Sequence, residues 1–251
     1  MFVDRVGRAE RTGTLVFARP GERAALAAGL VAFFLLGYFG LGIGSATPSA
    51  RDLGTPLDAW LPFVPASVWV YMTAYPMAFA PLLVLRDECL YQRTVAALAV
   101  VIAASLLCFA LLPVSTAGLR PHAAVLRGPG FTAWALRGLY ALDPPRNAFP
   151  SLHLAIGTVI ALAAGRGDRM LRLAGAGWLS ALALSASLVK QHFVADTAAG
   201  LLLGAAADAW IVRPAAHSSA SGGTSRRGAL ALLGVAALFY ASLCAVFRFF
   251  G

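Results

Sequence analysis

Seven long apolar stretches restrict what this chain can fold into. A helix needs about 20 mostly apolar residues to cross the roughly 30 Å hydrocarbon core of a bilayer. The stretches that meet or approach this length are residues 24–46, 64–85, 94–114, 151–165, 173–189, 193–212 and 228–249. Lipid offers no water to backbone polar groups and no alternating, strand-like pattern is present, so each stretch is expected to be a helix.

The composition agrees with a membrane protein. Of the 251 residues, 59% are hydrophobic and 12% charged, which excludes a disordered chain and an ordinary soluble domain, where about a quarter of the residues are charged. The net charge of +9 is scattered along the chain, so it does not predict a nucleic-acid partner. We therefore expect an all-α integral membrane protein.

The first apolar stretch has a second interpretation, as a signal peptide, because arginines precede it and small residues follow it. Its apolar region is longer than the roughly 7–15 residues of a signal sequence, and the leader before it is also long. We expect it to remain as the first membrane span.

Basic residues divide unequally between the two sides of the predicted bundle. Thirteen lie before the first span or in the second, fourth and sixth connections. Seven lie on the other side, namely Arg51, Arg120, Arg127, Arg137, Arg146, Lys190 and Arg248. Because cytoplasmic loops carry the excess of Lys and Arg, the N-terminus is predicted to be cytoplasmic and the second side extracytoplasmic.

A first polar cluster, RNAFPSLH, ends the long third connection at residues 146–153. Pro150 suits the start of a helix, since the N–H that it lacks would be unpaired there. Ser151 and His153 then lie in the first turn, beside free N–H groups and the positive end of the helix dipole. This arrangement favours an anion.

A second cluster, SLVKQHFVADTAAG, joins the fifth and sixth spans. His192 and Asp196 are four residues apart, so on a helix they share a face and can form a hydrogen bond. A carboxylate bonded to one imidazole nitrogen leaves the other nitrogen free to react. Asp196 lies in an apolar run, where an ionisable group is costly and indicates function. Lys190 adds a cation two residues before His192.

The predicted topology gathers these groups on one side of the membrane, together with Arg120 and Arg146. Zinc is one alternative, because His192, Asp196 and His153 have plausible ligand chemistry. The surplus of cations is unfavourable beside a dication and favours an anionic substrate. We therefore expect phosphate chemistry with no metal and no other cofactor.

The order of the motifs, RP at residues 120–121, PSLH at 150–153 and HxxxD at 192–196, resembles the type 2 phosphatidic acid phosphatase superfamily. The resemblance covers residues 24–212 and implies a six-helix catalytic core. It implies that His192 attacks phosphorus to give a phosphohistidine, that Asp196 orients His192, and that His153 protonates the leaving group. It further implies that Ser151, nearby N–H groups and Arg120 hold the phosphoryl oxygens.

The chain also departs from the family pattern. Pro113 and Ala186 stand where the phosphatases have a Lys and an Arg, and Leu152 replaces a common Gly. Lys190 and Arg146 are candidates to replace the missing cations. The PSLH sequence, and the Lys190 and Gln191 that precede His192, look more like the branch that contains inositol phosphorylceramide synthases and related bacterial proteins. We therefore expect the inner (plasma) membrane of a bacterium.

The resulting domain prediction has four parts. Residues 1–23 are a cytoplasmic segment, 24–212 the six-helix membrane catalytic domain, 213–227 a linker rich in Ser, Gly and Ala, and 228–251 an extra C-terminal transmembrane helix. The sequence does not indicate an oligomeric state.

Three functions remain open at this stage. The first is a phosphatase that releases phosphate from a lipid on the extracytoplasmic face, and the second is a phosphotransferase that moves a headgroup between lipids. A phosphodiester carries less charge than a monoester dianion, so the missing cations favour the second. Attack by water is the default fate of an exposed intermediate, and we expect hydrolysis. The third is a membrane protein that keeps the fold without catalysis.

Overall fold

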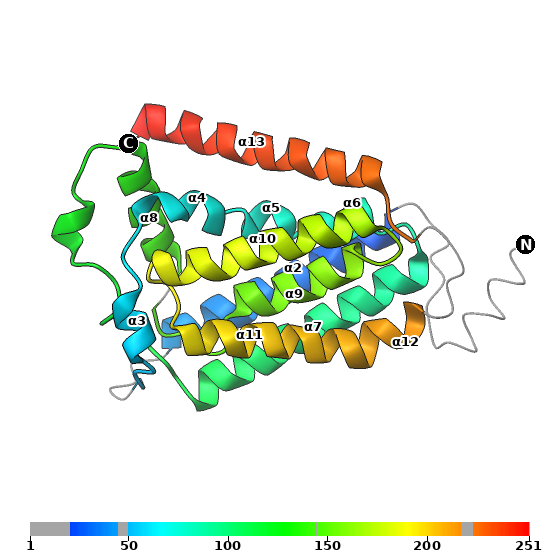
Figure 1. Ribbon diagram of the computed structural model, residues 1–251, viewed down its shortest axis with the longest axis horizontal. Helices are drawn as coiled ribbons and strands as arrows, with labels where there is room; N and C mark the ends of the chain where they lie inside the picture. Colours follow the sequence, from blue (N-terminus) through cyan, green and yellow to red (C-terminus); the bar gives the residue numbers. More distant parts are fainter. Residues whose placement is uncertain (1–20, 45–49, 144, 217–222, 251) are drawn as a thin grey trace, which may run out of the picture.

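The chain folds into a bundle of helices that run along its longest dimension (Figure 1). The computed structural model describes residues 21–44, 50–143, 145–216 and 223–250. These residues form helices, turns and three isolated β-bridges, and they include no strand. The prediction of an all-α protein is confirmed.

In the described part of the chain, five helices are long and apolar enough to cross a membrane, so the chain is an integral membrane protein. They are α2 (Glu22–Gly44), α7 (Glu88–Leu111), α10 (Arg169–Leu188), α11 (Val194–Ala207) with its π-helical continuation η3 (Asp208–Val212), and α13 (Arg226–Phe250). A further apolar helix, α9 (Leu152–Ala164), is shorter. Six of the predicted stretches therefore form helices in the described part of the chain, with ends shifted by a few residues.

Residues 64–85 do not form the single uninterrupted helix that the sequence predicts. The chain passes instead through η1 (Pro65–Ser67), α4 (Val68–Tyr71), α5 (Ala74–Met77) and α6 (Ala80–Val84). Pro76 and Pro81 have no N–H to donate to the preceding turn, and nearby N–H groups bond three residues back, as Tyr75 does to Met72 at 3.2 Å. Proline therefore divides this stretch into a jointed segment.

The most extensive helix contact joins α9 and α11, which start at the same end of the bundle. A Cβ atom at Gly200 would lie 2.3 Å from the carbonyl oxygen of Ser151, and one at Gly204 would lie 2.5 Å from that of Ala155. Only glycine permits this approach, and the Gly-x-x-x-Gly spacing is typical of tightly packed membrane helices. The two predicted polar clusters are brought together as a result.

Short helices cover the end of the bundle where α9 and α11 begin. They are α3 (Pro56–Trp60), η2 (Ala123–Leu126) and α8 (Phe131–Leu142), seen with their loops on the left of Figure 1. We call this the capped end, formed by residues 50–67, 113–143, 145–153 and 188–196. At the opposite end, α2 begins and α12 (Arg213–Ala216) follows η3.

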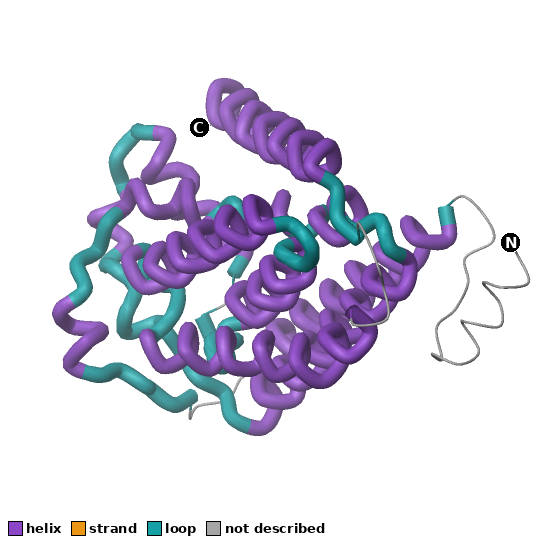
Figure 2. The backbone as a smooth tube through the Cα atoms, turned by 45° about the vertical axis from the view of Figure 1, so that its right-hand side comes forward, coloured by secondary structure: helices purple, strands orange, loops and turns teal. Residues whose placement is uncertain are grey.

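The C-terminal helix α13 lies along the outside of the bundle (Figure 2). It packs against α5, α6 and α8. The Tyr240 hydroxyl donates to the Trp69 carbonyl, and the Phe247 ring lies 5.0 Å from the ring of Phe131 between centroids. Aromatic contacts therefore attach α13 to the jointed segment and to α8.

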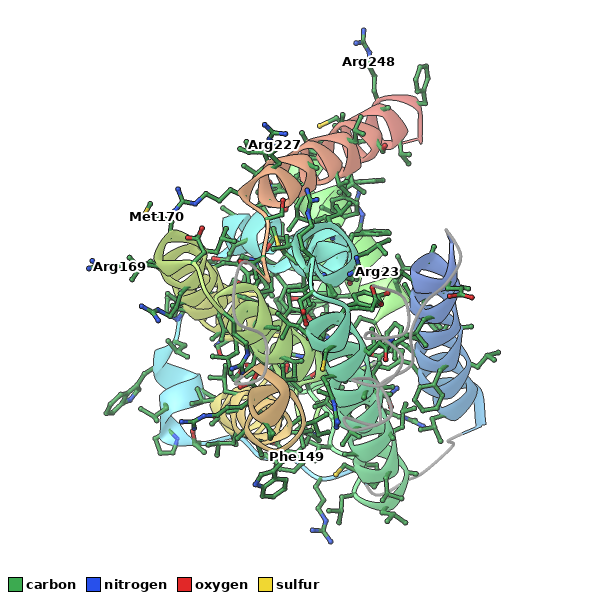
Figure 3. All side chains as sticks on the ribbon, turned by 90° about the vertical axis from the view of Figure 1, so that its right-hand side faces the viewer. Arg23, Phe149, Arg169, Met170, Arg227 and Arg248 are labelled. Atoms are coloured by element: carbon green, nitrogen blue, oxygen red, sulfur yellow. The ribbon has the colours of Figure 1, made fainter. Side chains whose placement is uncertain are left out.

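The opposite end is held by ion pairs between arginines and carboxylates. Arg166 contacts Asp208 at 2.5 Å and Arg226 contacts Asp168 at 2.5 Å. Arg169 and Arg227 point away from the helices at this end (Figure 3). Most of the predicted N-terminal segment, residues 1–20, and residues 217–222 of the predicted linker lie outside the described residues.

Candidate active site

His192 and Asp196 meet at the start of α11, although only Asp196 is helical. The helix begins at Val194, so His192 lies in the preceding turn, and the prediction that the two residues share a helical face is wrong. Asp196 reaches back instead. Its Oδ2 accepts the Phe193 N–H at 2.9 Å and lies 3.6 Å from Nδ1 of His192, which is too long for a hydrogen bond but within ion-pair range.

Both side chains are almost completely buried, with exposed fractions of 4% for His192 and 0% for Asp196. Neither ring nitrogen of His192, nor Oδ1 of Asp196, has a hydrogen-bond partner among the described residues. Most buried polar atoms in proteins are paired, and exceptions are frequent at sites that bind a ligand. The unpaired imidazole is therefore the strongest chemical signal at the capped end.

Lys190 holds the turn that carries His192. Its φ of 57° lies in the left-handed region that glycine usually occupies after a helix. Its Nζ donates to the carbonyl oxygens of Asp58 at 2.9 Å and Leu61 at 2.6 Å. Burial lowers the pKa of Lys190, and the Asp58 carboxylate opposes this shift. The ammonium is thus bound by backbone carbonyls of the α3 region.

Asp58, which the sequence analysis missed, fixes the other side of this turn. Its Oδ1 accepts the Val194 N–H at 2.7 Å, and its Oδ2 accepts the N–H and hydroxyl of Thr55 at 2.8 and 2.6 Å. Burial raises the pKa of Asp58, but the hydrogen bonds from Thr55 and Val194 outweigh burial and leave the pKa lowered. Its one sequence signal, Thr and Asp three apart at a helix start, predicts only a cap.

Ser151 and His153 stand at the start of α9, as predicted. Ser151 is the N-cap residue, and its N–H donates to the Asp196 carbonyl at 3.0 Å. Its hydroxyl makes no capping bond and, like the His192 nitrogens, is buried without a described partner. The His153 and His192 rings lie 6.1 Å apart between centroids. The structure therefore brings both histidines, Asp196 and Ser151 to one place.

The two predicted arginines differ in their surroundings. Arg120 donates to the carbonyl oxygens of Tyr140 at 3.1 Å and Asp143 at 2.7 Å, while its Nε is buried with no described partner. Burial lowers the pKa of Arg120, opposed by Asp143. Arg146 is half-buried, and its side chain makes no hydrogen bond or ion pair with another described residue. Both arginines thus keep donor groups that a ligand can use.

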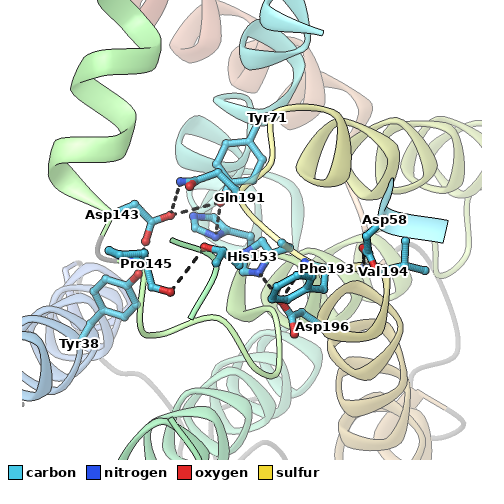
Figure 4. A network of polar contacts seen from close by, with 12 residues as sticks. Tyr38, Asp58, Tyr71, Asp143, Pro145, His153, Gln191, Phe193, Val194 and Asp196 are labelled. Atoms are coloured by element: carbon cyan, nitrogen blue, oxygen red, sulfur yellow. Dashed lines mark hydrogen bonds and ion pairs between the residues drawn. The ribbon is translucent and has the colours of Figure 1, made fainter. Parts of the chain in front are cut away.

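A second carboxylate missed by the sequence analysis is Asp143, directly after α8. It is joined to His153 through the Tyr71 hydroxyl, which lies 3.4 Å from Oδ2 of Asp143 and 2.9 Å from Nδ1 of His153 (Figure 4). In the sequence, Asp143 is indistinguishable from an ordinary residue at a helix end. Only the fold shows that residues 71, 143 and 153 meet.

The zinc alternative requires at least three ligands around one ion. Within the described ranges, no group of three His, Cys, Asp or Glu side chains is placed to hold a metal. The Asp196 contact is on one nitrogen of His192, and the Tyr71 contact is on one nitrogen of His153.

Sequence comparison identifies the family of the chain. The PAP2 superfamily pattern matches residues 54–210, which include all seven predicted site residues and leave α2 and α13 outside. No curated protein and no solved structure matches the chain. The matched region is more than half of the chain. The resemblance predicted from the three motifs is confirmed, and the chain belongs to the PAP2 superfamily.

Proposed function

We propose that this protein is a lipid-phosphate phosphatase that acts through a phosphohistidine at its capped end. The observation that carries the proposal is the buried His192 ring, unpaired at both nitrogens, with the Asp196 carboxylate 3.6 Å from Nδ1. Membership of the PAP2 superfamily supports phosphatase-type chemistry in general. The membrane-spanning helices make a lipid the natural source of the phosphate.

In the first step, one bond forms at phosphorus and one breaks. The Asp196 carboxylate lies beside Nδ1 of His192, so Nε2 is the nitrogen that attacks, and its lone pair forms the N–P bond. The bond from phosphorus to the leaving oxygen breaks as His153 transfers a proton to that oxygen. The products are a free alcohol, phosphohistidine at His192 and a neutral His153.

The second step returns the enzyme to its starting state. Water attacks phosphorus, the N–P bond breaks, and His153 accepts the proton that water releases. Inorganic phosphate leaves, and His192 recovers its lone pair. The same two histidines therefore serve both half-reactions without any net gain or loss of protons on the enzyme.

The phosphoryl oxygens need donors that are already in place. We assign this role to three groups at the capped end that have donors without a described partner, namely the Ser151 hydroxyl, Arg146 and Nε of Arg120. Lys190 was predicted to bind phosphate as well. Because its ammonium donates to two carbonyls, we instead propose that it holds the turn of His192 in place.

The orientation of the site rests on the distribution of basic residues. The arginine-rich opposite end is assigned to the cytoplasm and the capped end to the extracytoplasmic side, in the inner membrane of a bacterium. In this orientation the phosphohistidine faces an aqueous compartment in which water is the abundant acceptor. Hydrolysis is therefore favoured over transfer.

One observation favours the second candidate, a headgroup phosphotransferase. Three buried carboxylates, Asp58, Asp143 and Asp196, lie at the capped end, while Lys190 is engaged by carbonyls. A site with this charge balance stabilises a phosphodiester monoanion more readily than a monoester dianion. In that case a lipid alcohol in place of water resolves the same intermediate.

The experiment incubates the purified protein with phosphatidic acid, isoprenyl phosphates or phosphatidylinositol, with and without diacylglycerol or ceramide. Release of inorganic phosphate from the monoesters supports the phosphatase, and a new phosphodiester lipid supports the transferase. We expect His192→Ala to lower kcat about 1000-fold or more and His153→Ala to lower it about 100-fold.

The matched control is His122→Ala, because His122 lies in the long connection that leads to His153 but is exposed. It should keep wild-type activity. If the two site variants turn over every substrate at the wild-type rate, the mechanism is refuted and the non-catalytic alternative is supported.

A further inference from the structure

The carboxylate of Asp143 is a meeting point for elements that are distant in the sequence. It accepts hydrogen bonds from the hydroxyl of Tyr38 in α2 and from the side-chain amide of Gln191 in the His192 turn, the latter at 2.9 Å. The Tyr71 hydroxyl of α4 lies 3.4 Å from its Oδ2. Figure 4 shows these side chains converging on Asp143.

The burial of this carboxylate is costly unless its partners compensate for lost hydration. Asp143 is 9% exposed, and the guanidinium of Arg120 donates to its backbone carbonyl, with the side chain left to neutral donors. Three donors on one carboxylate replace hydrogen bonds that water would otherwise make to it. The network thus places a negative charge close to His153 without an ion pair.

Tyr71 connects this charge to His153. Its hydroxyl has one hydrogen and lies near two groups that can accept it, Oδ2 of Asp143 and Nδ1 of His153 at 2.9 Å. A carboxylate accepts only, so the hydrogen is best directed to Asp143, and the tyrosine oxygen then accepts from Nδ1–H. This chain fixes the proton on Nδ1 and leaves Nε2 as the nitrogen that gives or takes the transferred proton.

We propose that Asp143 is a positioning residue that acts through Tyr71 to hold His153 as the proton donor for the leaving group. The inference rests on the role proposed for His153. The same carboxylate also accepts a hydrogen bond from Gln191, the residue next to His192. Asp143 therefore sets the relative placement of the acid and the nucleophile.

Tyr38 gives the first helix a part in this network. It is the one buried side chain among residues 22–41, the rest of which is half-buried or exposed. The helix lies outside the region that matches the superfamily, residues 54–210. Its Tyr38 hydroxyl completes the shell of Asp143 without contacting His153, so its loss should weaken the network less than the loss of Tyr71.

The test separates protonation of the leaving group from structural support. An alkyl phosphate such as dodecyl phosphate needs a proton on its leaving oxygen, whereas p-nitrophenyl phosphate has a stable leaving anion and does not. We compare kcat/KM, which reports the step that forms phosphohistidine and leaves out its hydrolysis. We expect Tyr71→Phe and Asp143→Asn to lower kcat/KM on the alkyl ester about 100-fold and to leave kcat/KM on the aryl ester within about threefold of wild type. Tyr38→Phe should give a smaller loss with the same selectivity.

The matched control is Tyr91→Phe. Tyr91 is also fully buried, and its hydroxyl donates to the Arg23 carbonyl at the opposite end, away from the site. Equal losses on both esters in Tyr71→Phe and Asp143→Asn would overturn the inference, because a merely structural defect does not distinguish leaving groups.

A second measurement requires no turnover. In protein labelled with ¹⁵N-histidine, the His153 signals, assigned with His153→Ala, should show a proton fixed on Nδ1 in the wild type. Tyr71→Phe and Asp143→Asn should change that tautomer distribution, and Tyr91→Phe should not. Unchanged tautomers refute the inference even if the protein proves inactive on every substrate. Failure of the proposed function is recognised separately, by wild-type turnover that survives His192→Ala.

Discussion

The two ends of the bundle use charge in opposite ways. At the opposite end, arginines and carboxylates pair directly, as Arg166 does with Asp208 and Arg226 with Asp168. At the capped end, Lys190 and Arg120 donate to backbone carbonyls, and the one ion-pair contact found there among the described residues joins His192 to Asp196. One end neutralises its charges, while the other keeps them separate.

This difference distinguishes structural charge from functional charge. A paired arginine contributes to stability but has little left for a ligand, whereas an unpaired buried donor costs about 1–3 kcal/mol until a ligand satisfies it. The capped end holds several such groups, including the Ser151 hydroxyl and both His192 nitrogens. We therefore expect substitutions to affect activity at one end and stability at the other.

Among the substitutions that test the division between the two ends, the largest effect is expected from Ser151→Ala. The hydroxyl is buried without a described partner and does not cap α9, so its removal should leave the melting temperature unchanged or slightly raised. Loss of one preorganised donor to phosphoryl oxygens should lower kcat about 100-fold. Thermal unfolding in detergent and phosphate release measure the two quantities. A lower melting temperature with normal kcat would show that Ser151 is structural.

The fold class and the positions of the polar clusters follow from local sequence. Apolar length predicts the helices because lipid leaves the backbone no alternative, and Pro-Ser predicts the start of α9. The clusters around His153 and His192 are visible because ionisable groups in apolar runs are rare. Their contact depends on Gly200 and Gly204, whose Gly-x-x-x-Gly spacing favours close helix packing but does not identify the partner helix.

Other features depend on tertiary contacts that residue spacing does not encode. Asp143 and Tyr71 are 72 positions apart, and their contact exists because α4 and α8 pack together. The role of Lys190 was predicted from its distance to His192 along the chain, whereas its ammonium is taken by the carbonyls of Asp58 and Leu61. Residues 64–85 were predicted to be one helix because the stretch is apolar throughout. Hydropathy does not register the breaks that Pro76 and Pro81 cause.

Asp208→Asn at the opposite end is expected to have the converse effect, a loss of stability without a loss of activity. Its carboxylate is buried and contacts Arg166, whose side chain is 21% exposed. Breaking a fully buried pair costs roughly 3–5 kcal/mol, and partial exposure of Arg166 reduces this to about 2 kcal/mol. Thermal unfolding should show the loss, while kcat of the folded enzyme stays at the wild-type value.

The control for this prediction is Arg226→Gln, which breaks a pair whose arginine is 69% exposed. Its loss of stability should be clearly smaller than that of Asp208→Asn. If Asp208→Asn lowers kcat as much as Ser151→Ala does, the two ends are coupled and the division between them is incorrect.

The smallest effect is expected from two substitutions of Lys190, which combines a strained backbone with a bound ammonium. Lys190→Met removes the charge but keeps a side chain at a φ of 57°, whereas Lys190→Gly removes both the charge and the steric strain. Glycine adopts this conformation freely, so Lys190→Gly should be more stable than Lys190→Met by about 1 kcal/mol. Both variants lose the hydrogen bonds to α3, and we expect both to lower kcat by a similar factor. A kcat restored in Lys190→Gly alone would mean that the backbone turn, and not the ammonium, positions His192.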